Sequence, residues 1–278
     1  MAWRGSAGRG WGGSVAAFSA GPALLVPVLL LAFWPVWRWY AARMTDGSDE
    51  PLGIVALLTA CAFLPRRGWR DAIPAQRLIG VLAALVAYLL GFAMLPALVR
   101  GALAIAAIAC ALPRDAARPP WPLGALLLLS LPLIATLQFY LGFPLRVATT
   151  WCAAHLLALG GYDVVAHGTI LQWAGEEVLV DAPCSGIRML WTASYLSATL
   201  AACHRLPASG LIRLMQWTGA VVFAANLART VVLFFLETRL WPNPAWAHEV
   251  AGLALFQQAV GACVAGARWM HARIRTAP

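Results

Sequence analysis

A cysteine, Cys184, opens a long apolar run in the stretch DAPCSGIRML (residues 181–190), and Arg188 follows it by one helical turn. The positive end of a helix dipole and a neighbouring guanidinium both stabilise negative charge, so they favour the thiolate form of a cysteine placed there. The thiolate is the nucleophilic form of the side chain. The residue types and their spacing therefore predict an activated thiol.

A nucleophilic thiol works with a proton carrier and with a group that stabilises the charge developing on its substrate. His248, in the stretch HEVAGLALF, begins a later apolar run, and Arg229, in NLART, lies in the run before it. If these segment ends meet in the fold, Cys184, His248 and Arg229 form a set suited to acyl transfer.

The other five cysteines have ordinary surroundings. Four lie in apolar runs, where free cysteine usually acts as a small hydrophobic side chain: Cys61, Cys110, Cys203 and Cys263. A disulfide between Cys152 and Cys184 is an alternative to a free thiol in an oxidising compartment. The sequence has no CxxC motif and no Cys/His metal spacing, so we expect no metal and no cofactor.

The composition places these residues in a membrane. Of the 278 residues, 62% are hydrophobic and 11% are charged, and the mean hydropathy is +0.75. A soluble domain of this length could not bury so much apolar surface. The net charge of +9 comes from arginines scattered among short connectors, without a basic tract that includes aromatics, which argues against nucleic acid as a partner.

Eight apolar runs are candidate membrane spans, because about 20 residues at ~1.5 Å rise cross a ~30 Å hydrocarbon core. They are residues 21–40, 51–65, 76–95, 97–112, 122–142, 185–204, 211–236 and 247–267. Between the fifth and the sixth, residues 143–161 have helical apolar spacing, and residues 162–183 alternate β-branched and polar residues across Ala174–Gly175. This segment predicts an interfacial helix followed by a β-hairpin.

Arginine placement orients the spans. With eight spans, the arginines of connectors 66–77, 114–118 and 205–213 lie on the same side as both termini, and basic residues are enriched in cytoplasmic loops. The opposite side receives the acidic segment 161–183 and the segment ends that carry Cys184 and His248. By helical rise, Arg188 lies about 6 Å and Arg229 about 10 Å below that outer surface. Either arginine could snorkel, but ionisable residues at membrane depth are functional candidates by default.

We therefore expect an all-α polytopic membrane protein of about eight transmembrane helices with a small extracytoplasmic cap, the interfacial helix plus the β-hairpin. Its predicted parts are a cytoplasmic tail (1–19), N-terminal transmembrane helices (20–142), the cap (143–183), catalytic transmembrane helices (184–270) and a cytoplasmic tail (271–278). The remaining histidines fit the role of proton carrier less well. His204 and His271 lie on the inner side, and His155 and His167 lie in the cap.

The stretches APCSGIRML, NLARTVVLFFL and HEVAGLALF occur in this order and together resemble the exosortase/archaeosortase family of polytopic membrane transpeptidases. The CSG triplet, the N-x-x-R pattern and the glycine four residues after the histidine all match. The resemblance is specific over about 150–260 and only general over the first 140 residues. By matching position, the family's catalytic cysteine, arginine and histidine are Cys184, Arg229 and His248.

The resemblance implies cleavage of a short C-terminal sorting signal, PEP-CTERM in the best-known branch, from exported proteins. The thiolate of Cys184 would form a thioester, His248 would carry the proton, and Arg229, together with Arg188, would stabilise the oxyanion. Ser185, of the CSG triplet, and Asn226, one turn before Arg229, are supporting residues.

The implied partners are membrane lipid, the exported proteins and an unidentified acceptor nucleophile, for which a lipid and a polysaccharide are candidates. The implied location is the bacterial cytoplasmic (inner) membrane, with the active site toward the periplasm. Two other functions stay open at this point. A transporter would use Arg188 and Arg229 as an anion site, and a non-catalytic polysaccharide-assembly component would need the CSG triplet only as a helix start. Transport should survive Cys184→Ser, whereas acyl transfer should not.

Overall fold

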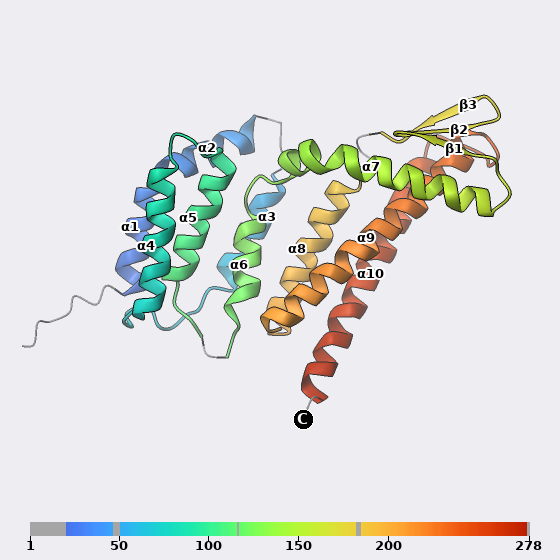
Figure 1. The fold of residues 1–278 in the computed structure, drawn as a ribbon. Coiled ribbons are helices and arrows are strands. Elements are labelled where there is room, and N and C mark those ends of the chain that lie inside the picture. The colour runs from blue at the N-terminus through green and yellow to red at the C-terminus, as the bar shows by residue number, and fades with distance from the viewer. Residues whose placement is uncertain (1–20, 47–50, 116, 182–184, 277–278) are drawn as a thin grey trace, which may run out of the picture.

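A computed structural model describes residues 21–46, 51–115, 117–181 and 185–276, and it is mostly helical (Figure 1). The N-terminal helices are α1 (Pro22–Ala32), α2 (Trp34–Thr45), α3 (Leu52–Ala62), α4 (Ala75–Leu90), α5 (Ala97–Ala111) and α6 (Pro120–Leu129). After the long helix α7 (Ile134–Leu159) come strands β1 (Val165–His167), β2 (Ile170–Trp173) and β3 (Glu176–Leu179). The C-terminal helices are α8 (Ile187–Cys203), α9 (Ala208–Glu237) and α10 (Ala247–Thr276).

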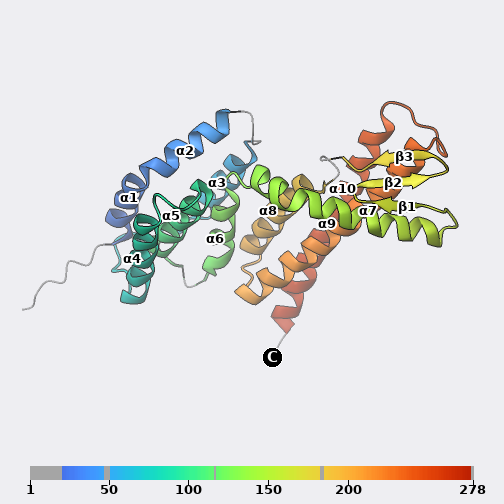
Figure 2. The ribbon, with the colours of Figure 1, turned by 45° about the horizontal axis from the view of Figure 1, so that its top comes forward.

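The helices form two groups that α6 connects. Helices α1–α6 lie on one side and α8–α10 on the other, and α6 packs against α8 (Figure 1). Helix α7 runs across one end of this assembly, and the small sheet lies beyond it, next to the junction of α9 and α10 (Figures 1 and 2). Many large apolar side chains on the helices are exposed, as expected for surfaces that face lipid.

The eight predicted spans are not confirmed. Within the described residues, α9 and α10 are long and apolar enough to cross a membrane, and up to four spans result if two sharply bent helix pairs each count as one. Helices α3, α4 and α5 are apolar but shorter, with 11, 16 and 15 residues. The sequence estimate counted turn residues as span: residues 91–95, included in the third run, form a turn between α4 and α5.

Two prolines explain the bent pairs. The first predicted span, 21–40, is divided at Phe33, where α1 and α2 meet at 65°; Pro35, at the start of α2, has no N–H to continue the α1 ladder. The fifth, 122–142, is divided at residues 130–133, where α6 and α7 meet at 86° and where Pro132 interrupts the helix. The predicted interfacial helix therefore starts earlier than expected, because residues 134–142 belong to α7 and not to an upright span.

The predicted hairpin is present, and one further strand extends it. Strands β2 and β3 are antiparallel around Ala174 and Gly175, both with positive φ, and β1 pairs with β2 to give a three-stranded sheet. The sheet buries Leu171 and Val178 against α7 and against Phe234 near the end of α9. The cap is thus one hydrophobic core with the top of α9.

The C-terminal helices pack closely through small and hydroxyl-bearing residues. The buried hydroxyls of Ser197 on α8 and Thr218 on α9 are 2.6 Å apart. The indole N–H of Trp217 on α9 donates to the carbonyl of Ala262 on α10 at 3.0 Å, and its ring lies over Gly266. Small residues let helix backbones approach in a membrane, and these contacts fix the register of α9 against both neighbours.

Candidate active site

Cys184 lies outside the described residues, so the site is defined by the residues around it. Ser185 directly follows it, is 4% exposed, and donates its hydroxyl to Oε1 of Gln138 on α7 at 2.8 Å. Gly186 has φ +76°, a left-handed conformation that favours glycine. A side chain there would meet the side chain of Asn226 on α9, since a Cβ on Gly186 would lie 3.1 Å from the Asn226 Cγ.

Helix α7 holds the chain on both sides of Cys184. On the preceding side, Nη1 of Arg146 donates to the carbonyl oxygen of Val180 at 3.5 Å, and on the following side Gln138 accepts from Ser185. Arg146 and Gln138 are eight residues apart on the same helix. Helix α7, which the break at Pro132 turns across the bundle, therefore contacts Val180 and Ser185, the described residues nearest to Cys184 that it bonds on each side.

Arg229 lies between α9 and α10. It is partly buried, and its guanidinium packs on Gly252 of α10, where a Cβ would lie 3.5 Å from Nε and 3.7 Å from Nη2. The Nε atom of Arg229 is buried and has no hydrogen-bond partner among the described residues. Buried charged donors are normally paired, so this N–H fits a partner that arrives with a substrate.

Asn226 connects Arg229 to the start of α8. It is 3% exposed, lies against Gly186, and precedes Arg229 by about one turn. The hydroxyl of Thr230 donates to its carbonyl at 3.1 Å. Asn226 thus brings the residues that follow Cys184 onto the same part of α9 that carries Arg229.

His248 is held by an acid at the end of α9. Its Nε2 lies 3.1 Å from Oε1 of Glu237, and the two side chains are 36% and 48% exposed. A carboxylate that accepts from Nε2–H leaves Nδ1 as the basic nitrogen of the neutral ring. Because both groups are so exposed, the pair adds little to stability, and its effect is to fix the tautomer and the orientation of the ring.

Pairwise contacts link several of the predicted residues across α8, α9 and α10, while Cys184 itself lies outside the described part of the chain. Gly186 and Asn226 join α8 to α9, while Arg229 with Gly252 and Glu237 with His248 join α9 to α10 at two successive levels. Arg188 differs from Arg229, since it is exposed on the first turn of α8 rather than enclosed between two helices. The two arginines therefore do not form an equivalent pair.

The remaining histidines lie elsewhere. His155 contacts Trp151 on an exposed face of α7, with its Nδ1 2.8 Å from the Trp151 carbonyl oxygen, and His167 ends β1. His204 and His271 have ring centroids 4.7 Å apart, at the end of the bundle far from the cap. Among the residues that the structure describes, no group of His, Cys, Asp and Glu is arranged to hold a metal ion.

Sequence reasoning missed two residues of the site, Glu237 and Gln138. Glu237 is the last residue of α9, and α9 packs against α10, which begins next to His248. An acid at the end of one span and a histidine at the start of the next predict such a pair once the two helices are known to be antiparallel neighbours. Gln138 is a polar residue in the fifth predicted span, and it contacts Ser185 because the chain breaks before α7. A single sequence does not reveal that α7 and the start of α8 meet.

Comparison with known families matches residues 14–265 to the family described as transmembrane exosortase (Exosortase_EpsH). The match omits only 13 residues at each end of the 278-residue chain. Neither a curated protein nor a solved structure matches the chain.

Proposed function

The chain belongs to the transmembrane exosortase family, and we propose on that basis that it is a membrane-embedded cysteine transpeptidase that cleaves a C-terminal sorting signal from exported proteins. Cys184 would be the nucleophile, His248 the proton carrier and Arg229 the group that stabilises the oxyanion. Ser185, Asn226 and Glu237 position these three, and Arg188 assists at the rim of the site.

The proposed reaction has two acyl transfers. His248 takes the proton of the Cys184 thiol, and the thiolate sulfur attacks the scissile carbonyl carbon to give a tetrahedral oxyanion. Collapse of this intermediate breaks the C–N bond, and His248 returns its proton to the leaving amine. A nucleophile from the acceptor then attacks the thioester carbonyl, its proton passes through His248 to the sulfur, and the Cys184 thiol is restored.

Beside the family match, the structural observation that supports the proposal is the buried Nε of Arg229, which has no hydrogen-bond partner within the described residues. An oxyanion is strong enough as an acceptor to pair with such a donor, and a preorganised donor of this kind is worth roughly 3 kcal/mol to the transition state. Gly252 leaves the space in which the guanidinium lies, so α10 holds Arg229 without a side chain at this position. The contact between Asn226 and Gly186 brings the start of α8 to the same region.

The substrate we propose is a membrane-anchored chain that presents its scissile bond near the cap. The start of α8, at Ile187, lies beneath α7, and the acidic residues Glu176 and Glu177 belong to the sheet beyond (Figure 1). We place this end of the bundle on the periplasmic side of the bacterial inner membrane, because the arginine-rich connectors lie at the other end. The acceptor is a surface nucleophile, with a lipid hydroxyl and a polysaccharide hydroxyl as candidates.

The test measures processing of a candidate substrate in cells that carry single-cysteine variants of the protein. The substrate is an exported protein with a short C-terminal motif, an apolar segment and an arginine-rich tail. A variant that retains Cys184 and has the other five cysteines replaced should process the substrate normally. The matched variant that retains only Cys152, which α7 carries near the cap, should process none. Processing by a correctly inserted Cys184→Ser protein would exclude acyl transfer and favour a non-covalent role of the arginines.

A further inference from the structure

Three cavities meet at the end of the molecule opposite the cap. A basic cavity of about 460 Å³ lies between the connector 62–71 and the connector 114–118. It shares Pro65 and Arg118 with an apolar cavity of about 250 Å³, and Leu64 with a second apolar cavity of about 280 Å³. The two apolar cavities in turn share Leu112. The three cavities are therefore neighbours, and we refer to them together as the hollow, with the basic cavity as its mouth and the two apolar cavities as its interior.

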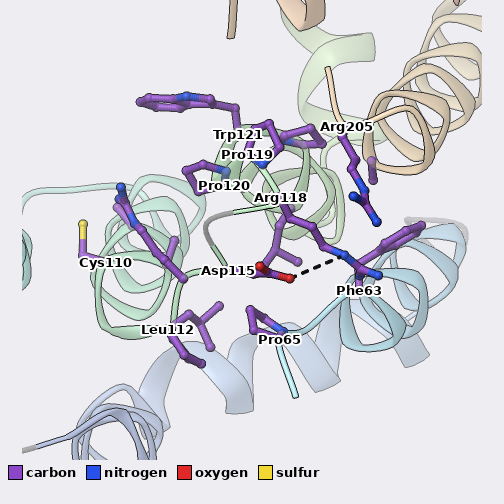
Figure 3. Close-up of a pocket in the computed structure, with 18 residues that line it drawn as sticks. Phe63, Pro65, Cys110, Leu112, Asp115, Arg118, Pro119, Pro120, Trp121 and Arg205 are labelled. Carbon is purple, nitrogen blue, oxygen red and sulfur yellow. Dashed lines mark ion pairs between the residues drawn. The ribbon is translucent and has the colours of Figure 1, made fainter. Parts of the chain in front are cut away.

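The mouth carries excess positive charge. Four arginines and two acids line it: Arg66, Arg67, Arg114, Arg118, Asp71 and Asp115. Asp115 partly neutralises Arg118 in an exposed ion pair of 3.9 Å (Figure 3). Arg205, from the connector after α8, lines the adjoining apolar cavity and approaches the same region (Figure 3).

Arg77 has a structural role at this end of the molecule, because its guanidinium donates to the carbonyls of Cys110 and Leu112 and so caps the end of α5. Arg66, Arg67 and Arg114 are exposed at the cavity mouth instead. Their guanidinium groups are available for the bidentate hydrogen bonds that arginine forms with phosphate.

The interior suits acyl chains. The first apolar cavity is lined by side chains such as Phe63, Ala106 and Ala109, and the second by side chains such as Leu57 and Ile108. Trp121, 57% exposed at the start of α6, also lines the first apolar cavity (Figure 3). Tryptophan at the edge of an apolar segment is typical of the level of lipid headgroups.

We propose that this hollow binds an anionic phospholipid, with the phosphate at the arginine-lined mouth and the acyl chains in the two apolar cavities. A basic pocket between transmembrane helices is the arrangement by which membrane proteins hold acidic headgroups. A soluble anion would leave the apolar interior empty, and a phospholipid fills both parts. The site is separate from the Cys184 region, because the proposed active site lies at the other end of α8 and α9.

The test titrates the full-length protein in detergent with phosphatidylglycerol and with phosphatidylcholine of identical chains, and native mass spectrometry counts the bound lipid. The triple variant Arg67→Gln/Arg114→Gln/Arg118→Gln should bind phosphatidylglycerol on the order of 100-fold more weakly, since each arginine near an acidic headgroup contributes about five-fold. The control Arg213→Gln/Arg268→Gln/Arg273→Gln removes the same charge from α9 and α10, outside the three cavities, and should bind normally.

Two further arms identify the ligand class. Ala109→Phe, which fills part of the first apolar cavity, should weaken phosphatidylglycerol binding. Glycerol 1-phosphate should not displace the lipid at millimolar concentration. Equal losses of lipid affinity in both triple variants would show diffuse electrostatic attraction and overturn the site. Normal phosphatidylglycerol binding by Ala109→Phe would also overturn it. Full displacement by glycerol 1-phosphate would replace the lipid with a soluble anion. If the first triple variant is poorly folded, Arg118→Gln alone decides, with Arg213→Gln as its control.

Discussion

The contact between Arg229 and Gly252 allows a graded test of the proposed oxyanion site. A Cβ added at Gly252 would lie 3.5 Å from Nε, 3.6 Å from Cζ and 3.7 Å from Nη2, which is ordinary van der Waals contact. Gly252→Ala should therefore leave Arg229 in place. Since alanine is favoured over glycine in a helix interior by about 0.5–1 kcal/mol, we expect α10 to be as stable or slightly more stable.

Gly252→Leu should have the opposite effect on activity. Each further carbon–carbon bond is about 1.5 Å long, so the branch carbons of leucine enter the space that the guanidinium occupies. Arg229 must then move by about 1 Å or more, and misplacement of this size can cost on the order of 10²-fold in rate. We expect Gly252→Leu to insert and fold normally while processing falls about 100-fold.

The assay follows conversion of the substrate to its processed form by pulse–chase, with protein amounts checked by immunoblot. Gly261→Leu is the matched control, because Gly261 is on the same helix and a Cβ there has no atom within 4 Å. The reasoning fails if Gly252→Leu processes normally, since Arg229 would then not depend on this contact. It also fails if Gly261→Leu loses as much activity, since the loss would then reflect α10 as a whole.

Four further outcomes are expected. Glu237→Gln should reduce processing with little change in melting temperature, because Glu237 orients His248 through an exposed pair; a loss of several degrees would instead indicate a structural role. His248→Ala should slow acylation by about 10²–10⁴-fold, with partial recovery at higher pH as more thiol ionises, measured by thioester trapping. Arg229→Lys should lose most of the activity, because lysine lacks the planar fork; normal processing would make Arg229 a packing residue. Burial, and then the nearby His271, lower the pKa of His204, so the folded state resists protonation of this ring. The free energy of unfolding should therefore fall as the pH drops below about 6.5. In thermal melts at pH 7.5 and 5.5, His204→Gln should reduce the difference in melting temperature between the two pH values.

The parts of the fold that could be predicted from the sequence are those set by local patterns. The apolar runs became helices, and the alternation around Ala174 and Gly175 became a hairpin whose turn residues have positive φ. The positions of the breaks were not predicted, because hydropathy alone does not separate a proline at a turn from a proline inside an apolar span. Pro35 and Pro132 decide where the chain bends, and each was counted as part of a span.

The candidate site shows the same division between local and distant information. The CSG triplet, the N-x-x-R pattern and the histidine were visible as motifs, and the structure gives a physical reason for the two glycines that accompany them. Gly186 has φ +76° against Asn226, and Gly252 leaves the space in which Arg229 lies. The partners Gln138 and Glu237 were not visible, because each depends on which distant helix is the neighbour.

The break at Pro132 connects the fold to the chemistry. Gln138 and Arg146, both on the helix that follows the break, contact Ser185 and Val180, which lie on either side of Cys184 in the sequence. Helix α7 runs across the bundle and also packs, together with the sheet, around Phe234. Phe234 lies five residues beyond Arg229 on α9. One helix therefore contacts Val180 and Ser185 through polar groups and the end of the arginine helix α9 through apolar ones.

It follows that a change in the cap core, such as Phe234→Ala, should disturb the alignment of the site through α9. We expect such a variant to lose processing in proportion to its loss of cap stability, and a stable cap with a lost activity would show that Phe234 acts at the site directly.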